Sequence, residues 1–477
     1  MSKRIAIIGA GPGGYVAAVR AAQTGADVTI IERDNVGGTC LNWGCIPSKV
    51  MITTAEMLDR FKRAGEFGLT LEGRIYPDMQ ALMARKARVI QDQAKGILEL
   101  LRHHKVTLLR GKGVIEAPGL ATVHASDGHA QEVPWDKLIL ATGTQPLHFP
   151  AFPFDGEKIL SSNDVLSLTE IPRSVLILGG GVIGCEFAFI LASLGSDVMV
   201  VEALDRLLPL PSVDEDCSKV LQREMKKRRI KFMVRKVVES VDPAGEKLRV
   251  TLCPSPLVSG ITEKEKEPLT VETDKMVVCV GRTPNTADMG LEKLGIRVDP
   301  KNWIIADERT KTNNPDVYAI GDVLGPSKIM LAHVASTEAS VAAENAMGGN
   351  RTMAYDAVPG AIFTSPEVAN VGLTEAQARE RSLPVRADTV LFRTLGKAQV
   401  IGEIAGEAKI ISDSENGRVI GVHMIGPHVT DLIAEGTLAI KMGATVRDLA
   451  ETIHAHPTLA EVMLEASFKS LDRSLHG

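Results

Sequence analysis

A pattern of apolar strand, glycine-rich turn, small-residue helix and second strand occurs twice in this chain. In the first copy, the apolar residues 5–8 lead to Gly9, Gly11 and Gly14 in the spacing GxGxxG, and Glu32 ends the second strand. Such glycines allow a tight turn, close approach of the backbone to a pyrophosphate and tight helix packing, while the helix N-terminus favours phosphate charge. A carboxylate at the position of Glu32 accepts hydrogen bonds from a ribose. The stretch therefore predicts a dinucleotide site at the edge of a parallel sheet.

The second copy begins with the strand at residues 175–178 and continues with Gly179, Gly181 and Gly184, followed by Glu202. The interval from the third glycine to the acid is 18 residues in both copies, and the copies start 170 residues apart. A single GxGxxG is often only a turn, but the repeated strand, helix, strand and acid predict two dinucleotide sites.

Glu202 also bears on which nucleotide the second site accepts. A carboxylate at the ribose accepts a hydrogen bond from the 2′-hydroxyl of NAD and repels the 2′-phosphate of NADP. Arg206 could serve a phosphate, but it carries less weight beside the acid. The second site is therefore predicted to take NAD.

Two cysteines, Cys40 and Cys45, stand in the stretch GGTCLNWGCIPSK at residues 37–49. In a regular helix their Cα atoms would lie about 8.6 Å apart, whereas a disulfide needs roughly 4.4 to 6.8 Å. A bridge would require a distorted turn, which Gly44 can permit, and a strained bridge is easily reduced. A pair of buried thiols is the alternative reading of this spacing alone.

Composition excludes several classes of protein. A chain of 477 residues is too long for one core and should form about three or four domains. A net charge of −5 gives no excess of basic residues for binding nucleic acid. No apolar run is long enough to cross a membrane. Glycines and a proline interrupt the apolar opening before it could act as a signal peptide, so a cytoplasmic location is expected.

Six cysteines in so long a chain form no disulfide framework. No cluster of metal ligands is visible, so no metal is expected. Outside the pair at residues 40 and 45, the cysteines lack a partner spacing and are expected to be packing residues: Cys185, Cys217, Cys253 and Cys279.

Between and after the two copies, apolar strands end in short polar motifs. Residues 137–141 lead to Ala141-Thr142-Gly143, residues 276–280 lead to GRTPN, and residues 317–320 lead to Gly321-Asp322. Residues 82–102 have helical periodicity and predict a solvated pair of amphipathic helices. Residues 254–270 are polar and predict a surface hairpin or loop.

From about residue 350 strands and helices alternate without a phosphate loop, which predicts an α+β domain for association. The expected strands are residues 368–373, 400–404, 408–412 and 419–425, and the expected helices are residues 430–441 and 459–471.

The string HAHPTLAE at residues 454–461 pairs a histidine with a carboxylate. Pro457 suits the first position of a helix and holds His456 extended, leaving Glu461 about one turn inside. Glu461 could then orient His456 and raise its basicity. Thr458 and Glu461 equally fit a capping box, and His456 could be a simple N-cap. Spacing leaves catalysis and capping open.

Together these motifs resemble one family, the pyridine nucleotide-disulfide oxidoreductases, over essentially the whole chain. Within that family, PSK after Cys45 and HAHPT look like the enzymes that oxidise dihydrolipoamide, whereas glutathione and trypanothione reductases usually carry PKK. The resemblance implies an α/β fold with two Rossmann-like dinucleotide-binding domains and a C-terminal α+β dimerisation domain. The implied limits are an FAD-binding domain at residues 1–147, an NAD-binding domain at 148–275, a central domain completing the FAD site at 276–347 and an interface domain at 348–477.

The resemblance also implies roles for the motif residues. FAD would occupy the first site and NAD the second, and the chain would form a homodimer. Cys40, the more exposed sulfur, would exchange with the substrate, and Cys45 would face the flavin. His456 of the partner subunit, held by Glu461, would take the proton of the attacking dithiol. Lys49 would lie near the flavin and pair with Glu186.

The cofactor contacts implied by the resemblance form two sets. Those for FAD are Gly9, Gly11, Gly14, Glu32, Thr39, Lys49, Gly113, Thr142, Gly143, Asp322, Met330, Leu331, Ala332 and His333. Those for NAD are Gly179, Gly181, Gly184, Glu186, Glu202, Val237 and Gly281. His333 is expected to act through its backbone.

The expected partner is a protein that carries a lipoyl group, either the acyltransferase of a 2-oxoacid dehydrogenase complex or the lipoyl protein of glycine cleavage. The chief alternative is another flavoprotein disulfide reductase, of the glutathione type, that uses NAD(P)H. A third possibility is a binding or structural subunit in which both nucleotides only hold the fold. The intact set of Cys40, Cys45, His456 and Glu461 argues against this third class.

Overall fold

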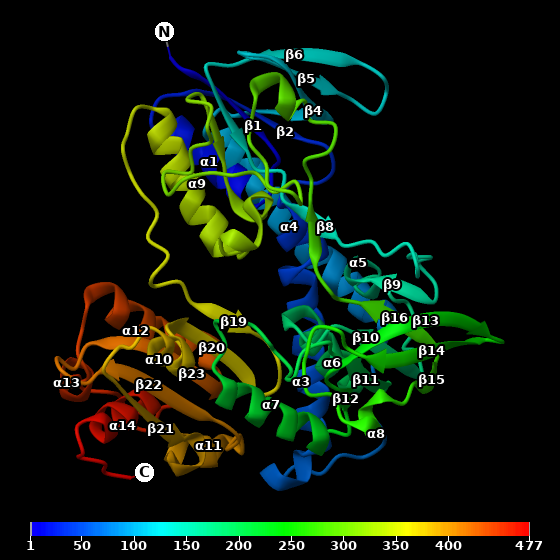
Figure 1. Cartoon of the computed structure of the whole chain (residues 1–477), viewed down its shortest axis with the longest axis vertical. Helices are drawn as coiled ribbons and strands as arrows, with labels where there is room; N and C mark the ends of the chain where they lie inside the picture. The colour runs from blue at the N-terminus through cyan, green and yellow to red at the C-terminus, as the bar shows by residue number, and fades with distance from the viewer. Residues whose placement is uncertain (1, 477) are drawn as a thin grey trace. The chain divides into compact units, whose positions relative to one another are not determined.

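The computed structural model describes residues 2–476, with Lys264 described by its backbone alone. The chain divides into two compact units, each assembled from three stretches (Figure 1). The first unit comprises Met1–Met51, Asp78–His148 and Gly281–Ala354. The second unit comprises Ile52–Pro77, Phe149–Val280 and Tyr355–Gly477.

The first unit is built on a five-stranded parallel sheet in the order β18-β7-β1-β2-β3. Its strands are β1 (Arg4–Ile8), β2 (Asp27–Glu32), β3 (Thr107–Arg110), β7 (Lys137–Leu140) and β18 (Val317–Ala319). Alternate side chains of the central strand β1 enter different cores because successive residues of a strand point to opposite faces. Ile5 and Ile7 belong to one apolar cluster, and Ala6 and Ile8 to another.

Helices and a small sheet accompany the parallel sheet of the first unit. On the side of Ile5 and Ile7, α1 (Pro12–Gln23) packs against α9 (Ala332–Ala346), side by side in Figure 1. On the side of Ala6 and Ile8, apolar residues of three antiparallel strands join the second cluster. These strands are β4 (Lys112–Ala117), β5 (Leu120–His124) and β6 (Ala130–Pro134). The remaining elements are α2 (Gly38–Trp43), the start of α3 (Cys45–Lys62), α4 (Met79–His103), β8 (Thr144–Pro146), β17 (Arg282–Pro284) and the 3-10 helices η2 (Leu291–Leu294) and η3 (Gly321–Ser327).

The predicted pair of helices at residues 82–102 is instead the single helix α4, 25 residues long. Asp78 caps its N-terminus by accepting a hydrogen bond from the N–H of Ala81. The interior holds no proline, and one exposed glycine, Gly96, is tolerated without a break. Nothing in the sequence of this stretch therefore ends the helix before His103.

Four strands of the second unit repeat the order of four strands in the first. The parallel sheet of the second unit has the order β12-β11-β10-β16-β9, so that the strand before the glycine loop again lies between its two nearest partners. The strands are β9 (Ile159–Ser161), β10 (Ser174–Leu178), β11 (Asp197–Val201), β12 (Lys231–Met233) and β16 (Lys275–Val278). The helices of this part are α5 (Ser162–Val165), α6 (Val182–Leu194) and α7 (Glu215–Lys227). The duplication seen in the sequence is therefore a duplication of the order of four strands, whereas the fifth strand differs, because β9 precedes its glycine loop in the chain and β18 follows its own.

Beside this parallel sheet lies an antiparallel sheet of β13 (Lys236–Ala244), β14 (Lys247–Pro254) and β15 (Leu269–Thr273). Apolar residues of the two sheets form one cluster that includes Leu176 and Val250. The stretch predicted as a hairpin or loop at 254–270 is mostly the connection between β14 and β15. It contains the short helix α8 (Glu263–Lys266), which Thr262 caps.

The C-terminal part of the second unit is an α+β arrangement, as predicted. Its five-stranded antiparallel sheet has the order β19-β20-β23-β22-β21. The strands are β19 (Gly360–Ile362), β20 (Glu367–Gly372), β21 (Val385–Leu391), β22 (Glu407–Asp413) and β23 (Val419–Gly426). The helices are α10 (Glu375–Glu380), α11 (Gly396–Ile401), α12 (Val429–Met442), α13 (Val446–Glu451) and α14 (Glu461–Ser470).

The strand predicted at residues 400–404 is wrong. Residues 400 and 401 end helix α11, and Gly402 follows as its C-cap with φ 67°. The edge of the sheet is formed by β21, which was not predicted. Val400 and Ile404 are exposed, so their apolar character does not mark a buried strand.

We expect one substitution, glycine to alanine, to change stability in opposite directions at two positions. At Gly96, on exposed helix α4, an added Cβ meets nothing within 4 Å, so Gly96→Ala should raise the free energy of unfolding by roughly 0.5–1 kcal/mol. At Gly426 an added Cβ would lie 2.4 Å from the ring of Phe392, so Gly426→Ala should lower it by about 1–3 kcal/mol. Calorimetric melting of both variants measures the two shifts, and shifts of equal sign would contradict this packing.

Candidate functional site

Each glycine loop follows the central strand of its parallel sheet and turns directly into a helix. In the first loop Gly9 has φ 104°, and a Cβ on Gly14 would lie 1.7 Å from the carbonyl oxygen of Gly9. In the second loop Gly179 has φ 107°, and a Cβ on Gly184 would lie 1.9 Å from the carbonyl oxygen of Gly179. The first and third glycines of both motifs are therefore required by the turn and by the close approach of loop and helix.

The middle glycine of each loop occupies the N-cap of the following helix. Gly11 precedes α1 and Gly181 precedes α6, and neither helix start has a side-chain cap. A Cβ on Gly181 would meet nothing within 4 Å, and one on Gly11 would meet only the Cα of Gly38, at 3.8 Å. The first amides of both helices are thus left to a ligand, and the helix dipole favours an anion there. Both loops fit the pyrophosphate of a dinucleotide.

The acids that end the second strands make the same contacts in both units. Glu32 accepts hydrogen bonds from the N–H of Ala10 at 2.6 Å and of Asp34 at 2.8 Å. Glu202 accepts them from the N–H of Gly180 at 2.6 Å and of Leu204 at 2.8 Å. Both carboxylates are buried. Each acid therefore ties its glycine loop to the end of the neighbouring strand, and its remaining acceptor capacity fits a ribose hydroxyl.

The guanidinium of Arg206 is bound to other residues of the second unit instead of being available for a ribose phosphate. It donates hydrogen bonds to the hydroxyl of Ser218 at 2.5 Å and to the carbonyl oxygens of Leu210 and Val213 at 3.1 and 3.0 Å. An arginine engaged in this way is not arranged to pair with a 2′-phosphate. These contacts support the low weight given to Arg206 beside Glu202.

The first unit leaves a polar group unsatisfied next to its glycine loop. The hydroxyl of Thr142 is buried and has no hydrogen-bond partner among the described residues. The backbone carbonyl oxygen of Thr142 accepts a hydrogen bond from the side chain of Asn285 at 2.9 Å. A buried hydroxyl without a partner costs free energy unless a ligand satisfies it. The Thr142 hydroxyl therefore fits the predicted FAD site.

Asp322 lies near Thr144 and Arg282, and no role was predicted for Arg282 from the sequence. Arg282 donates hydrogen bonds to the hydroxyl and the carbonyl oxygen of Thr144 at 2.6 and 3.0 Å, and the Thr144 hydroxyl lies 3.5 Å from the Asp322 carboxylate. Burial raises the pKa of Asp322, although the charge of Arg282 opposes this shift. The GRTPN motif contains Arg282, but only the fold brings it to Asp322.

The other predicted FAD residues lie on several elements of the first unit. Gly113 is on β4, where a Cβ would lie 3.1 Å from Ile8 and 3.2 Å from Ile31. Gly143 has φ 63° and open space around it. Thr39 is in α2, and the stretch 330–333 spans the start of α9, whose N-cap has no side-chain hydrogen bond.

The two predicted cysteines lie on either side of a break between helices. Helix α2 ends at Trp43, Gly44 has non-helical φ −150° and ψ −111°, and α3 starts at Cys45. A Cβ on Gly44 would lie 3.0 Å from the carbonyl oxygen of Thr39. The break brings the sulfur of Cys45 within hydrogen-bonding reach of Cys40, and both are thiols in this structure. The expected distortion at Gly44 is thus confirmed.

The two cysteines differ in exposure in the single chain, and which sulfur exchanges with the substrate stays a prediction. Cys40 is half-buried within α2, whereas Cys45, at the first position of α3, is exposed. The hydrogen bond to Cys45 and burial raise the pKa of the Cys40 thiol. Cys40 therefore holds its proton at neutral pH and needs a base if it is to act as a thiolate.

His456 and Glu461 form the predicted pair. The Nδ1 atom of His456 lies 2.8 Å from one carboxylate oxygen of Glu461, and the N–H of Thr458 donates to the other at 2.9 Å. Burial opposes ionisation of Glu461, but its bonds to His456 and Thr458 lower its pKa. The carboxylate thus orients an imidazole that is largely exposed, with a side-chain exposure of 75%.

The predicted helix start at Pro457 is wrong. Helix α14 begins at Glu461 with Ala460 as N-cap and without a side-chain cap, so His456 is not an N-cap. The hydroxyl of Thr458 donates to the carbonyl oxygen of Ala455 at 2.7 Å instead of completing a capping box. The carboxylate of Glu461 is therefore shared between the turn and the imidazole, which favours the histidine–carboxylate reading over simple capping.

Lys49 and Glu186 lie in different units. Lys49 is half-buried in α3, with its Nζ 3.5 Å from the hydroxyl of Ser48. Glu186 is buried in α6 and accepts a hydrogen bond from the N–H of Phe363 at 3.0 Å. Their ion pair stays a prediction.

The remaining predicted NAD residues also lie in different units. Val237 is on β13, directly after Lys236, whose N–H donates to the carbonyl oxygen of Glu202 at 3.0 Å. Gly281 is in the first unit, with φ 120° and its carbonyl oxygen 3.1 Å from the N–H of Leu147. Val237 is thus near the acid of the second loop, and the role of Gly281 stays a prediction.

Residues 2–476 lack two kinds of feature. None of the described helices is both long and apolar enough to span a bilayer. Within the same residues, no three histidine, cysteine, aspartate or glutamate side chains are grouped so that they could hold a metal ion.

Known proteins resemble this chain over its whole length. Residues 3–339 match the pyridine nucleotide-disulphide oxidoreductase family, and residues 358–467 match the dimerisation domain of that family. The dihydrolipoyl dehydrogenase of Chlamydia muridarum is 41% identical, with 98% of this chain and 97% of the relative covered. That of Bacillus subtilis is 36% identical over 98% and 97%.

A solved structure shows the same architecture. LpdA from Mycobacterium tuberculosis superposes with a TM-score of 0.89 at 29% identity, covering 98% of this chain and 99% of that one. The matched dimerisation domain supports a homodimer. The sequence resemblance is confirmed, and the chain belongs to the pyridine nucleotide-disulphide oxidoreductase family, with dihydrolipoyl dehydrogenases among its relatives.

Proposed function

We propose that the chain is an NAD-dependent dihydrolipoyl dehydrogenase. It oxidises dihydrolipoamide to the cyclic disulfide lipoamide, which releases two electrons and two protons. A disulfide between Cys40 and Cys45 accepts the electron pair, and NAD finally receives it as a hydride, so that NADH and one proton are the other products. The observation that supports this proposal most directly is the break at Gly44, which brings the two sulfurs together. The N–H of Gly37, just before α2, donates to the carbonyl oxygen of Ala10 in the first dinucleotide loop at 2.8 Å.

The two glycine loops supply the cofactor sites of this proposal. FAD, when bound in the first unit, carries the electron pair from the cysteine pair to the nicotinamide. The amides at the start of α1 hold its pyrophosphate, Glu32 its ribose, and Thr142 and Asp322 offer further polar groups. In the second unit the start of α6 and Glu202 hold NAD in the same way. Lys49 paired with Glu186 would place a cation near the flavin.

The cysteines and the histidine divide the thiol chemistry. One thiolate of dihydrolipoamide attacks Cys40, a mixed disulfide forms, and the sulfur of Cys45 leaves with the electron pair of the broken bond. The second thiol of the substrate then attacks the substrate's own sulfur in the mixed disulfide, which closes the ring of lipoamide and releases Cys40. The raised pKa of the Cys40 thiol agrees with this division, because Cys40 takes up a proton when it leaves the mixed disulfide and keeps it as a thiol. His456 of the partner subunit, oriented by Glu461, takes the proton.

Domain limits, partner and location belong to the same proposal. Residues 1–147 with 276–347 bind FAD, residues 148–275 bind NAD, and residues 348–477 pair the subunits. The lipoyl group comes from the acyltransferase of a 2-oxoacid dehydrogenase complex or from the glycine cleavage lipoyl protein. A cytoplasmic location agrees with a cysteine usage that forms no structural disulfide framework.

Anaerobic titration of the purified, FAD-loaded protein with dihydrolipoamide tests the proposal. The visible spectrum of the wild type should change, and added NAD should reverse the change with formation of NADH. Cys45→Ser should retain FAD and lose all turnover, because no enzyme disulfide can form. Cys253→Ser, a half-buried cysteine on β14, is the matched control and should keep wild-type turnover.

Two results would contradict this assignment. Wild-type turnover by Cys45→Ser would exclude the cysteine pair as the redox group. No response to dihydrolipoamide, together with reduction by NADPH and reoxidation by glutathione disulfide, would move the function to the alternative disulfide reductase.

His456→Gln should lower kcat with dihydrolipoamide by about 10²- to 10⁴-fold, because a positioned base contributes that much to proton transfer. Reduction of bound flavin by NADH, which precedes thiol exchange in the reverse direction, should keep its wild-type rate in stopped-flow measurements. His476→Gln is the matched control, since His476 is also exposed and lies 2.8 Å from a carboxylate oxygen of Glu465. An equal loss in both variants would remove His456 from the mechanism.

A further inference from the structure

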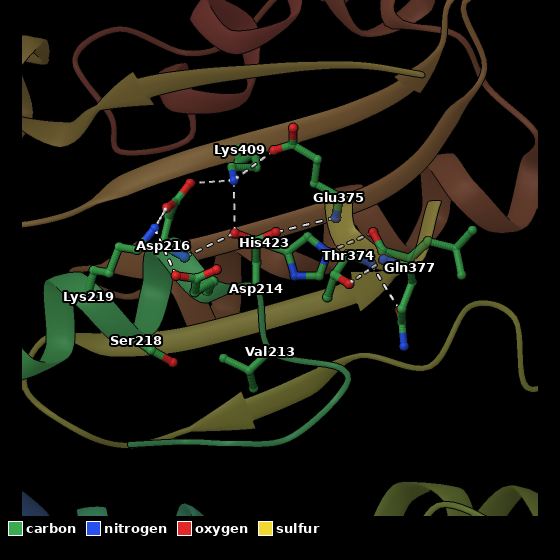
Figure 2. Close-up of polar contacts among 12 residues, drawn as sticks. Val213, Asp214, Asp216, Ser218, Lys219, Thr374, Glu375, Gln377, Lys409 and His423 are labelled. Atoms are coloured by element: carbon green, nitrogen blue, oxygen red, sulfur yellow. Dashed lines mark hydrogen bonds and ion pairs between the residues drawn. The ribbon is translucent and has the colours of Figure 1, made fainter. Parts of the chain in front are cut away.

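Lys409 is a buried cation on strand β22 that three carboxylates surround (Figure 2). Its Nζ atom lies 2.8 Å from Asp214, 2.5 Å from Asp216 and 3.2 Å from Glu375. The side chain is only 7% exposed. Burial opposes the charge, but the bonds to Asp214 and Asp216 raise the pKa of Lys409 well above its usual value. The group is therefore charged at any pH at which the protein works.

The carboxylates belong to the starts of two helices. Asp214 is the N-cap of α7 and accepts a hydrogen bond from the N–H of Asp216 at 3.1 Å. Glu375 is the first residue of α10, and its N–H lies 3.4 Å from the second carboxylate oxygen of Asp214. Lys409 thus joins helix α7, which belongs to the parallel sheet of the second unit, to the antiparallel sheet of the same unit.

The neighbour of Lys409 in the sheet adds no charge to this cluster. His423 on β23 pairs with Lys409 across the strands and directs Nε2 at the carbonyl oxygen of Leu373, 2.9 Å away. Burial lowers the pKa of His423, which therefore stays neutral. Lys219 also reaches Asp216, but from solvent, with 61% of its side chain exposed. Lys409 is the buried counter-charge of the cluster.

A second set of contacts connects α7 to the nucleotide loop. We call residues 203–213 the ribose segment, because they follow Glu202. At one end of this segment Leu204 donates to the Glu202 carboxylate at 2.8 Å and Leu208 donates to the carbonyl oxygen of Gly180 at 2.7 Å. Between these two residues, Arg206 joins the segment to α7 through Ser218, and it also donates to the carbonyl oxygens of Leu210 and Val213 near the other end of the segment.

We propose that Lys409 is a positioning residue for NAD. It fixes the first turn of α7, and through Arg206 and the ribose segment it holds Glu202 and Gly180 where the ribose and pyrophosphate bind. Without the cation, three carboxylates that now converge would repel one another and displace the start of α7. The inference rests on the proposed function of the second glycine loop as the NAD site, and it gives the C-terminal sheet a part in binding NAD.

Calorimetric titration of the FAD-loaded dimer with NAD tests the inference. Lys409→Met should weaken NAD binding about tenfold and raise the KM for NAD by a similar factor. The kcat at saturating NAD and the KM for dihydrolipoamide should not change, because the cysteine pair and the first loop lie in the other unit. His456 is held by Glu461, and Lys409 by three other carboxylates. Lys409→Arg, which keeps the charge, should restore most of the affinity. If the substitution only reduced the folded fraction, the concentration of active enzyme would fall, but the KM for NAD would not rise relative to the KM for dihydrolipoamide.

Lys219→Met is the matched control, since it removes a cation from Asp216 at the surface, and it should bind NAD as the wild type does. If Lys409→Met does not fold, the variant Lys409→Met/Asp214→Asn lowers the uncompensated charge and keeps an N-cap residue, because asparagine caps well. It should show the same weakened binding. Wild-type affinity in the folded lysine variant, or an equal loss in Lys219→Met, overturns the inference. A wild-type protein that binds no NAD refutes the proposed function instead.

Discussion

The hydrogen bonds that backbone N–H groups donate to Glu32 and Glu202 are the interaction on which both halves of the fold depend. Each carboxylate is buried, so it must be satisfied, and it is satisfied by one amide of the glycine loop and one amide beyond the strand. The loop is thereby fixed in a shape that only glycine can adopt. Because the same pair of hydrogen bonds recurs in both units, the same contact between carboxylate and glycine loop supports two nucleotide sites.

Much of the fold could be predicted because its determinants are local. Strand, glycine loop, helix and acid are encoded within about thirty residues, and both copies are confirmed with strand limits within a residue or two. The distorted turn between Cys40 and Cys45 was also predictable, since helix geometry and the preceding Gly44 define the problem and its solution. These features need no knowledge of distant contacts.

The errors arise where distant contacts decide the structure. Val400 and Ile404 are apolar and suggested a strand, but the sheet edge is taken by β21, which lies about ten residues earlier in the chain. Pro457 suits a helix start, yet the carboxylate of Glu461 is engaged with His456 and Thr458, and the helix begins later. Arg282 and Lys409 gave no local signal at all, because Arg282 bonds to Thr144 and Lys409 to Asp214 and Asp216, all more than 100 residues away in sequence.

Helices α1, α6 and α9 begin without side-chain caps at the positions assigned to cofactors. A serine or aspartate cap would stabilise each helix by about 1 kcal/mol, but it would compete with the ligand for the same amides. Nucleotides bound at these positions would act as the missing caps, and a ligand that binds only the native state adds its binding free energy to folding. The same uncapped amides that make room for the nucleotides would thus make the free energy of unfolding depend on cofactor concentration.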